Sequence, residues 1–161
     1  MDIQKAIADR RTIKKFKQDS IDESLVVSLL EKAKMAPNHR MTEPWNILFI
    51  GKETRVELKH KTDFGGAPIV FAITSSHGKT EVEHSENLAA TACFIQNFLL
   101  LAWAEGIGAF WSSMGASQAV KEKLQVPADA DITGILAIGY PEEIPAAKER
   151  ADIQTKISYL K

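Results

Sequence analysis

The spacing of apolar residues predicts two helices near the start of the chain. Apolar positions recur at helical spacing over residues 3–10, which predicts a short first helix that ends near Arg10. Ser20 and Glu23 have the form of a capping box, so we expect a second helix to open there and to end before Pro37. The apolar face of this second helix consists of Leu25, Val26, Leu29, Leu30 and Ala33.

Runs of β-branched and aromatic residues predict strands later in the chain, the first two of them bounded by glycine-containing turns. We expect a short polar helix or turn over 52–60 and a helix from Ser117 to Leu124. Strands and helices do not alternate regularly, which disfavours a doubly wound parallel sheet. We therefore predict a single α+β domain over residues 1–161, with a small mixed or antiparallel β-sheet flanked by helices. The predicted strands are 45–50, 69–73, 109–111 and 132–138.

The longest predicted helix, residues 85–105, is apolar on nearly all sides. Such a helix must be enclosed on most of its faces, which a domain of this size does not achieve alone. We therefore expect this central helix to lie at a dimer interface. Cys93, the single cysteine, stands in the apolar part of the helix, so we expect it to be core packing rather than a reactive thiol. A chain that cannot form an internal disulfide suits the reducing cytoplasm.

Charge and hydropathy argue against nucleic-acid and membrane partners. The formal net charge is −1, so no overall electrostatic field draws the protein to nucleic acid or to an anionic membrane. Polar residues interrupt the first ten positions, which disfavours a signal peptide. The most apolar stretch, residues 98–104, is too short to cross a bilayer. We expect a cytoplasmic protein.

Two groups of cationic residues are the strongest chemical feature of the sequence. Arg10 and Arg11 precede Thr12 directly behind the first helix, and Lys148 and Arg150 stand near the other end of the chain. Guanidinium groups present a planar fork of donors that matches phosphate oxygens, so the first group could bind a phosphate dianion. Taken alone, the first group could equally be a solvated basic loop and the second an exposed basic tail.

Other catalytic or metal-binding patterns are weak. Gly106-Ile107-Gly108 follows a helix and leads into a strand, which is the wrong order for a dinucleotide fingerprint. His77 and His84 flank a polar loop without a partner cysteine, so we expect surface histidines and no metal site. No nucleophile motif is present either.

Taken in order, several short motifs resemble the FMN-dependent nitroreductase family, and in particular its short members. The resemblance runs from Arg10 to Arg150. The motifs are Arg10-Arg11-Thr12, Pro37-Asn38-His39, Pro44-Trp45, Trp111-Ser112-Ser113 and Gly139-Tyr140-Pro141.

This resemblance implies a set of cofactor-binding residues. Arg10, Arg11 and Thr12 would hold the flavin phosphate and ribityl chain, and Lys148 with Arg150 would form a second clamp on the same phosphate. The remaining two groups would contact the isoalloxazine ring or the ribityl chain. They are Met35, Asn38 and His39, and Trp111, Ser112 and Ser113.

The resemblance also implies the activity. The family suggests an oxidoreductase in which hydride passes from NADH or NADPH to flavin N5, and electrons then reach a nitroaromatic, quinone or similar acceptor in a ping-pong mechanism. No protein side chain would be catalytic, because FMN carries the chemistry. Each site would be built from both chains of a homodimer. The alternatives are a flavin-binding carrier or sensor with little turnover, and an enzyme of the same fold with another task, such as dehalogenation.

The chain departs from the family pattern in three places. Glu43 stands where the family commonly has Gln, and the segment 59–63 offers no clear match for a Lys of the longer members. The segment 75–85 is short, which implies a more open pocket. We hypothesise that Arg10, Arg11 or the helix end behind His39 stabilises the reduced flavin in place of that Lys.

Overall fold

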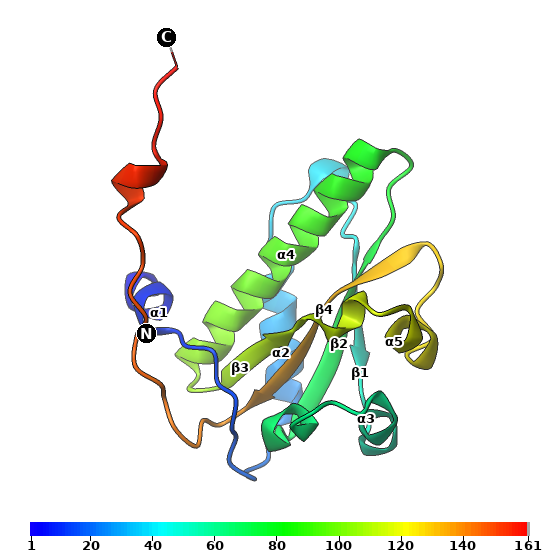
Figure 1. The fold of residues 1–161 in the computed structure, drawn as a ribbon, viewed down its shortest axis with the longest axis vertical. Coiled ribbons are helices and arrows are strands. Elements are labelled where there is room, and N and C mark those ends of the chain that lie inside the picture. The colour runs from blue at the N-terminus through cyan, green and yellow to red at the C-terminus, as the bar shows by residue number, and fades with distance from the viewer. Residues whose placement is uncertain (161) are drawn as a thin grey trace.

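A computed structural model describes residues 1–160, and within them the chain forms a four-stranded sheet between helices (Figure 1). The strand order is β1-β2-β4-β3, and each neighbouring pair is antiparallel. The α+β prediction is confirmed, and the sheet is the antiparallel variant of the two that the sequence allowed. The strands are β1 (Trp45–Phe49), β2 (Ile69–Ser76), β3 (Gly108–Ser112) and β4 (Ala130–Gly139).

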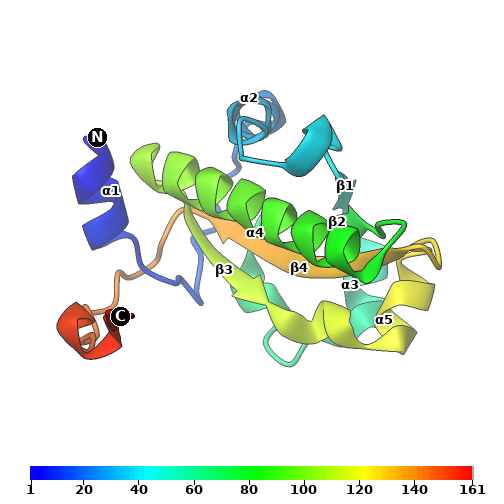
Figure 2. The same cartoon turned by 90° about the horizontal axis from the view of Figure 1, so that it is seen from above.

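The helices form two layers, one on each face of the sheet. Helices α2 (Glu23–Ala33) and α4 (Glu81–Ala104) cover one face, while α3 (Lys52–Leu58) and α5 (Gln118–Lys123) lie on the other (Figure 2). Helix α1 (Ile3–Asp9) packs against the C-terminal end of α4 (Figure 1). The 3-10 turns are η1 (His39–Met41), η2 (Asp63–Gly66), η3 (Ser113–Ala116) and η4 (Ile153–Lys156).

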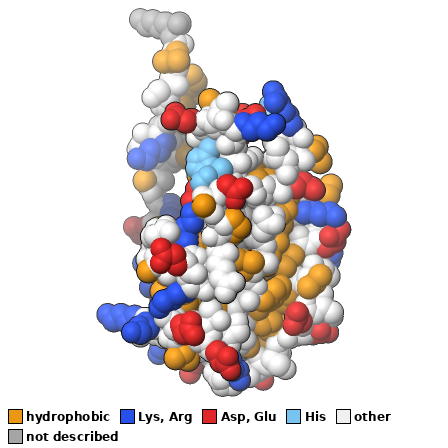
Figure 3. Space-filling model, turned by 90° about the vertical axis from the view of Figure 1, so that its right-hand side faces the viewer, with side chains coloured by type: hydrophobic (Ala, Val, Ile, Leu, Met, Phe, Trp, Pro, Cys, Tyr) orange, Lys and Arg blue, Asp and Glu red, His pale blue; other side chains and the backbone are white. Residues whose placement is uncertain are grey.

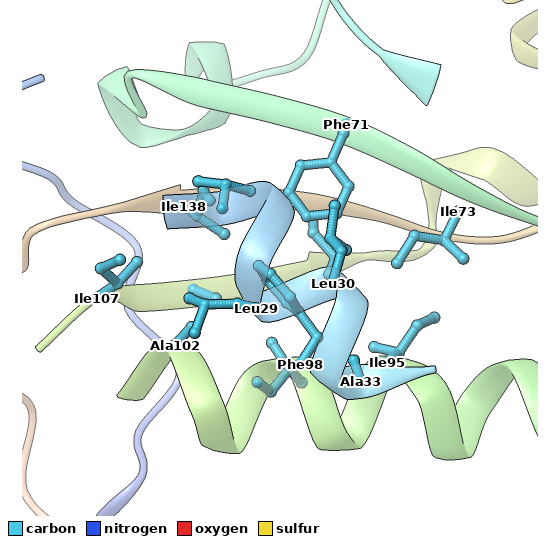
Figure 4. Packing of buried hydrophobic residues seen from close by; sticks show 14 of the residues in the cluster. Leu29, Leu30, Ala33, Phe71, Ile73, Ile95, Phe98, Ala102, Ile107 and Ile138 are labelled. Carbon is cyan, nitrogen blue, oxygen red and sulfur yellow. The ribbon is translucent and has the colours of Figure 1, made fainter. Parts of the chain in front are cut away.

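The two central strands send alternate side chains into two separate cores, because successive residues of a strand point to opposite faces. Phe71 of β2 and Leu136 of β4 face α2 and α4, where Phe98 packs edge-on against Phe71 with ring centroids 5.3 Å apart (Figure 4). Val70 and Ile135, their neighbours, face the side of α3 and α5. Both faces of the central strands are therefore buried, which explains the continuous apolar runs in the sequence.

Two helix starts and the burial of one strand differ from the predictions. The second helix is capped by Asp22, whose carboxylate accepts a hydrogen bond from Ser24 N at 2.9 Å, so the predicted Ser20 cap is wrong. Strand β1 is a half-buried edge strand rather than a buried one, because only β2 pairs with it. Helix α4 begins earlier than predicted, where the Thr80 hydroxyl accepts from Glu83 N at 3.1 Å.

Helix α4 buries one side against the sheet and exposes the other. It is long and apolar enough to cross a membrane by composition, yet it lies on the sheet with half of its most apolar window buried. The exposed side carries Ala89, Cys93 and Gln96. The prediction that Cys93 packs in the core is wrong, because the helical rotation turns it away from the sheet while its neighbour Phe94 is buried.

The last part of the described chain forms an extended arm that leaves the sheet after β4 (Figure 1). In a single chain, residues 143–160 are exposed, although part of the arm borders a cavity beside α1. Five large apolar side chains of the arm are exposed: Ile144, Ile153, Ile157, Tyr159 and Leu160.

Candidate functional site

The largest cationic concentration surrounds a cavity of about 710 Å³ between the start of the chain and the arm. Six Lys and Arg side chains line this cavity, against a single acidic one, Glu143. Two sequence groups that are well over a hundred positions apart meet here. The predicted residues that the structure brings together are Arg10, Arg11, Thr12, Lys148 and Arg150.

Backbone pairing at the edge of the sheet explains why these segments meet. Thr12 forms a parallel bridge with Ala109 of β3, so the segment behind α1 continues the sheet for a short distance. Farther along the same segment, Lys17 N donates to Tyr140 O at 2.9 Å. Tyr140 directly follows β4, and the arm leaves at Glu142. The Arg10–Thr12 segment and the root of the arm are therefore fixed beside each other.

A glycine permits the close crossing of these three segments. A side chain at Gly108, the first residue of β3, would place its Cβ 2.5 Å from Ile13 Cγ1 and 3.0 Å from Pro141 Cγ. Carbon atoms do not approach so closely, and Ile13 is itself buried. Any larger residue at position 108 would push the cationic segment away from the arm.

The charges around the cavity are not neutralised by the chain itself. Partial burial, and then the positive charges of Arg11 and Arg150, lower the pKa of Arg10 from its ordinary value. Among residues 1–160, the salt bridges do not include any of the cations that line this cavity. Arg11 Nη1 instead donates to Ala8 O at 2.7 Å, at the C-terminal end of α1. This arrangement is that of a receptor for an anion.

Three other predicted residues lie in the segment between α2 and β1. Met35 is 79% exposed behind α2, whose last residue, Ala33, accepts a hydrogen bond from Asn97 of α4. His39 lines a second cavity of about 380 Å³ together with Glu83 and Asn87 from the first turns of α4. The 24 residues of α4 rise about 36 Å, so a single chain does not bring His39 to the cationic cavity.

The segment around His39 has an unusual backbone. Arg40, Met41 and Glu43 have φ angles of 54°, 54° and 43°, in the left-handed region that residues with a Cβ seldom adopt. Asn38 holds this loop, because its side chain accepts from Glu43 N at 3.0 Å and donates to Ala36 O at 3.2 Å. Backbone strain of this kind concentrates at functional sites.

The third predicted group lies on β3 and the turn after it. Trp111 is 40% exposed, and its indole covers Gly134 of β4, where a Cβ would lie 2.1 Å from Nε1. Its Nε1–H donates to Thr133 O at 3.1 Å. Ser112 accepts from Met114 N through its hydroxyl, and Ser113 is exposed. The indole of Trp111 is therefore held on β4 by a hydrogen bond and is still partly exposed to solvent.

The structure also joins residues that we expected to be separate surface histidines. His77 Nε2 lies 3.0 Å and His84 Nε2 3.4 Å from Asp131 Oδ2, and Lys121 Nζ lies 3.2 Å from the other oxygen, Oδ1. Figure 3 shows histidine side chains gathered on one face of the molecule. Sequence spacing could not reveal this cluster, because Asp131 reaches it only through the pairing of β4 with β2, which places it opposite Ser75.

Comparisons with known proteins agree with this architecture. The sequence profile of the Nitroreductase family matches residues 7–62 and 55–140. The chain is 30% identical to a Bacillus subtilis (strain 168) protein named "Putative NAD(P)H nitroreductase YfhC", over 96% of this chain and 92% of the relative.

Solved structures show the same fold. A nitroreductase-like family protein from Bacillus cereus superimposes with a TM-score of 0.91 at 28% identity, covering 100% of this chain and 97% of the other. The NADPH:FMN oxidoreductase from Vibrio harveyi, complexed with NAD⁺, gives a TM-score of 0.88 at 17% identity, covering 99% and 77%. The family match, the identity over nearly the whole chain and the shared fold lead to one conclusion: this chain is an oxidoreductase of the nitroreductase family.

Proposed function

We propose that the chain is an FMN-dependent oxidoreductase that takes hydride from NADH or NADPH and reduces nitroaromatic, quinone or similar acceptors. Donor and acceptor would use one pocket in turn, in a ping-pong mechanism. The observation that carries this proposal is the cationic cavity, where residues 10–12 meet Lys148 and Arg150. The names of the Bacillus subtilis relative and the Vibrio harveyi structure support the choice of NAD(P)H and FMN.

The residues around the cavity fit a flavin phosphate. Arg10 and Arg11 offer guanidinium groups that can donate in pairs to phosphate oxygens, and Thr12 adds a hydroxyl donor. The like charges that lower the pKa of Arg10 would be compensated by a dianion. When bound there, FMN supplies the redox chemistry.

The protein's own contribution is binding and electrostatics. Guanidinium groups stay protonated throughout the physiological pH range, so Arg10 and Arg11 hold an anion without exchanging protons. Lys148 and Arg150 lie on the exposed arm, where water and salt screen their charge, so each should contribute less than Arg10. Asn38 and His39, held in the strained loop, would contact the cofactor from the other side.

We propose further that the active form is a homodimer, in which the loop of one chain meets the cationic cavity of the other. Within a single chain the cationic cavity and the cavity that contains His39 lie near opposite ends of α4. The exposed side of α4 and the five exposed apolar residues of the arm give a second copy of the chain an apolar surface to cover. A two-fold interface of this kind would yield two identical sites. We expect this dimer to work in the cytoplasm.

The test uses the untagged full-length protein after incubation with FMN. We expect one flavin per chain, a dimer by light scattering, and NAD(P)H oxidation that requires an added quinone or nitroaromatic acceptor. Arg10→Ala should release the flavin, whereas Lys52→Ala, at an exposed cation on α3, should retain it. A wild-type chain that does not bind FMN would overturn the proposal.

The carrier or sensor reading remains the second candidate, because of Glu43. This carboxylate is exposed and lines the same cavity as His39. A negative charge there would oppose the negative charge of a reduced flavin. Stoichiometric flavin without NAD(P)H turnover would identify a carrier, and recovery of turnover in Glu43→Gln would assign the cause to the carboxylate.

A further inference from the structure

The histidine cluster at the N-terminal end of α4 has the composition of a metal site. His77 follows β2, His84 lies in the first turn of α4, and Asp131 is the second residue of β4. One ligand atom from each lies within 4.8 Å of the other two. Two imidazoles and a carboxylate are ligands that zinc and related first-row divalent cations accept.

The distances within the cluster suit a single small cation. Around a tetrahedral zinc ion with bonds of about 2.0–2.1 Å, neighbouring ligand atoms lie about 3.3 Å apart. The two histidine nitrogens lie 3.0 and 3.4 Å from the same carboxylate oxygen, Oδ2 of Asp131. The imidazoles of His77 and His84 are perpendicular, with centroids 4.6 Å apart. Because both nitrogens contact Oδ2 and all three ligand atoms lie within 4.8 Å of one another, one cation beside Asp131 could contact all three.

We propose that His77 Nε2, His84 Nε2 and Asp131 Oδ2 form a binding site for a divalent cation of the Zn²⁺ class, with water in the remaining position. The three side chains are 32–38% exposed, so an ion can reach the site from solvent and keep a water ligand. The cluster has no residue in common with the lining of the cationic cavity, so the cation would occupy a site separate from the proposed phosphate site.

The remaining charge next to the cluster orients the carboxylate. Lys121 of α5 contacts Oδ1 at 3.2 Å, which leaves Oδ2 directed at the histidines. Partial burial alone would raise the pKa of Asp131, but Lys121 and then His77 outweigh it and lower that pKa. The carboxylate is therefore ionised near neutral pH, as a metal ligand must be. Glu83, on the same turn as His84, is engaged by Lys79 N and Arg40 instead.

Without metal, a histidine N–H is the natural partner of Asp131 Oδ2. A cation would replace that hydrogen bond, and each histidine would then bind through a deprotonated Nε2 and keep its proton on Nδ1.

A cation at this site would cross-link the turn between β2 and α4 to the sheet. His77 N already donates to Asp129 O at 2.7 Å, which holds the start of the turn between β2 and α4. A cation would add a link from that turn and from the first turn of α4 to β4. His77 also lines the cavity that contains His39, so the link would stabilise one wall of that cavity.

The experiment is a Zn²⁺ titration of the untagged full-length protein in competition with a chromophoric chelator, after removal of bound metal. We expect saturation at one Zn²⁺ per chain. His84→Ala should weaken Zn²⁺ binding by at least about tenfold. Even changes to residues that only support a metal ligand lower the affinity by about 10- to 100-fold. His60→Gln changes a histidine outside both the cluster and the proposed flavin site, and it should leave the affinity unchanged.

Thermal unfolding gives a second readout. Zn²⁺ at a hundred times the wild-type dissociation constant should raise the Tm of the wild type by about 5–10 °C, and the same addition should raise the Tm of His84→Ala by about half as much or less. His77→Gln serves as the second variant and should behave like His84→Ala. Absence of saturation below millimolar Zn²⁺ would overturn the proposal. An equal loss in His60→Gln, or unchanged binding in His84→Ala, would also overturn it.

Discussion

The two ends of helix α4 carry opposite electrostatic arrangements on one scaffold. At its C-terminal end, the cationic cavity gathers six positive side chains and one carboxylate, Glu143. At its N-terminal end, Asp131 is surrounded by His77, His84 and Lys121, so its charge is compensated within the chain. The first end requires an anion from outside. The second is satisfied alone, and a cation would have to displace a hydrogen bond there.

This difference shows how a single fold can separate two kinds of binding. Both ends are attached to the same buried cluster between α2, α4 and the sheet, but no charged side chain connects them within that core. Substitutions at one end should therefore leave the other unchanged, unless they disturb the shared core. The predictions below test this separation.

The largest effect should come from the core that both ends share. Phe98 of α4 is fully buried against Phe71. Phe98→Ala should lower the free energy of unfolding by about 3–5 kcal/mol, because it removes a large apolar side chain and leaves a cavity. Urea denaturation would measure the loss, and binding at both ends should weaken together. Val82→Ala, at an exposed position on the same helix, should change stability by less than about 0.5 kcal/mol.

The next effect should be confined to the cationic end. Arg10→Ala should weaken FMN binding by about 10- to 100-fold, since a hydrogen bond to a charged group contributes about 1.5–3 kcal/mol. Fluorescence quenching of FMN during titration would measure the change. The Zn²⁺ affinity at the other end should stay the same. A parallel loss of zinc binding would contradict the separation of the two ends.

The sequence predicted the elements and the family better than it predicted which side chains meet. Apolar runs located the four strands because β2 and β4 are buried on both faces. Local patterns could not locate contacts that depend on pairing between distant segments. The position of Asp131 beside His77 follows from the β2–β4 register, so the histidine cluster was missed. The exposure of Cys93 depends on the rotation of α4 over the sheet, which a helix apolar on most sides does not reveal.

The candidate site was predicted in part, for a related reason. The meeting of Arg10 with Arg150 was expected only through the family resemblance, and the structure confirms that both line one cavity. The roles of Met35 and His39 in cofactor binding remain predictions. A single chain places His39 near the far end of α4, and neither residue lines the cationic cavity, so a second chain would have to bring them there.

A smaller effect should distinguish the two halves of the cationic end. Lys148 lies on the exposed arm, whereas Arg10 is half-buried. Lys148→Ala should weaken FMN binding less than tenfold, and the difference from the wild type should shrink at high salt because an exposed charge is screened. Titrations at low and high ionic strength would measure both. A loss as large as that of Arg10→Ala would contradict this expectation and show that the second chain covers Lys148 as well as the apolar residues of the arm.

The smallest effect concerns His60, which lies in neither the cationic cavity nor the histidine cluster. Its titration should therefore affect the stability of the fold without changing binding at either end of α4. Its Nδ1 accepts from Phe64 N at 3.0 Å, and its ring stacks on Phe64 with centroids 4.2 Å apart. Partial burial lowers the pKa of His60, and the opposing charge of Asp63 does not reverse this. A histidine whose folded-state pKa lies below its unfolded value of about 6.5 stabilises the fold above that unfolded value, and this contribution is lost as the pH falls through the folded pKa.

Between pH 7.5 and pH 5 (about one unit above and more than one below that unfolded value) the wild type should therefore lose more stability than His60→Gln, by less than about 1 kcal/mol. Glutamine can still accept the Phe64 hydrogen bond but does not titrate. The other histidines are identical in both proteins, so their titration cancels in the difference. Urea denaturation at the two pH values would measure it, and equal losses would show that His60 titrates alike in the folded and unfolded chains.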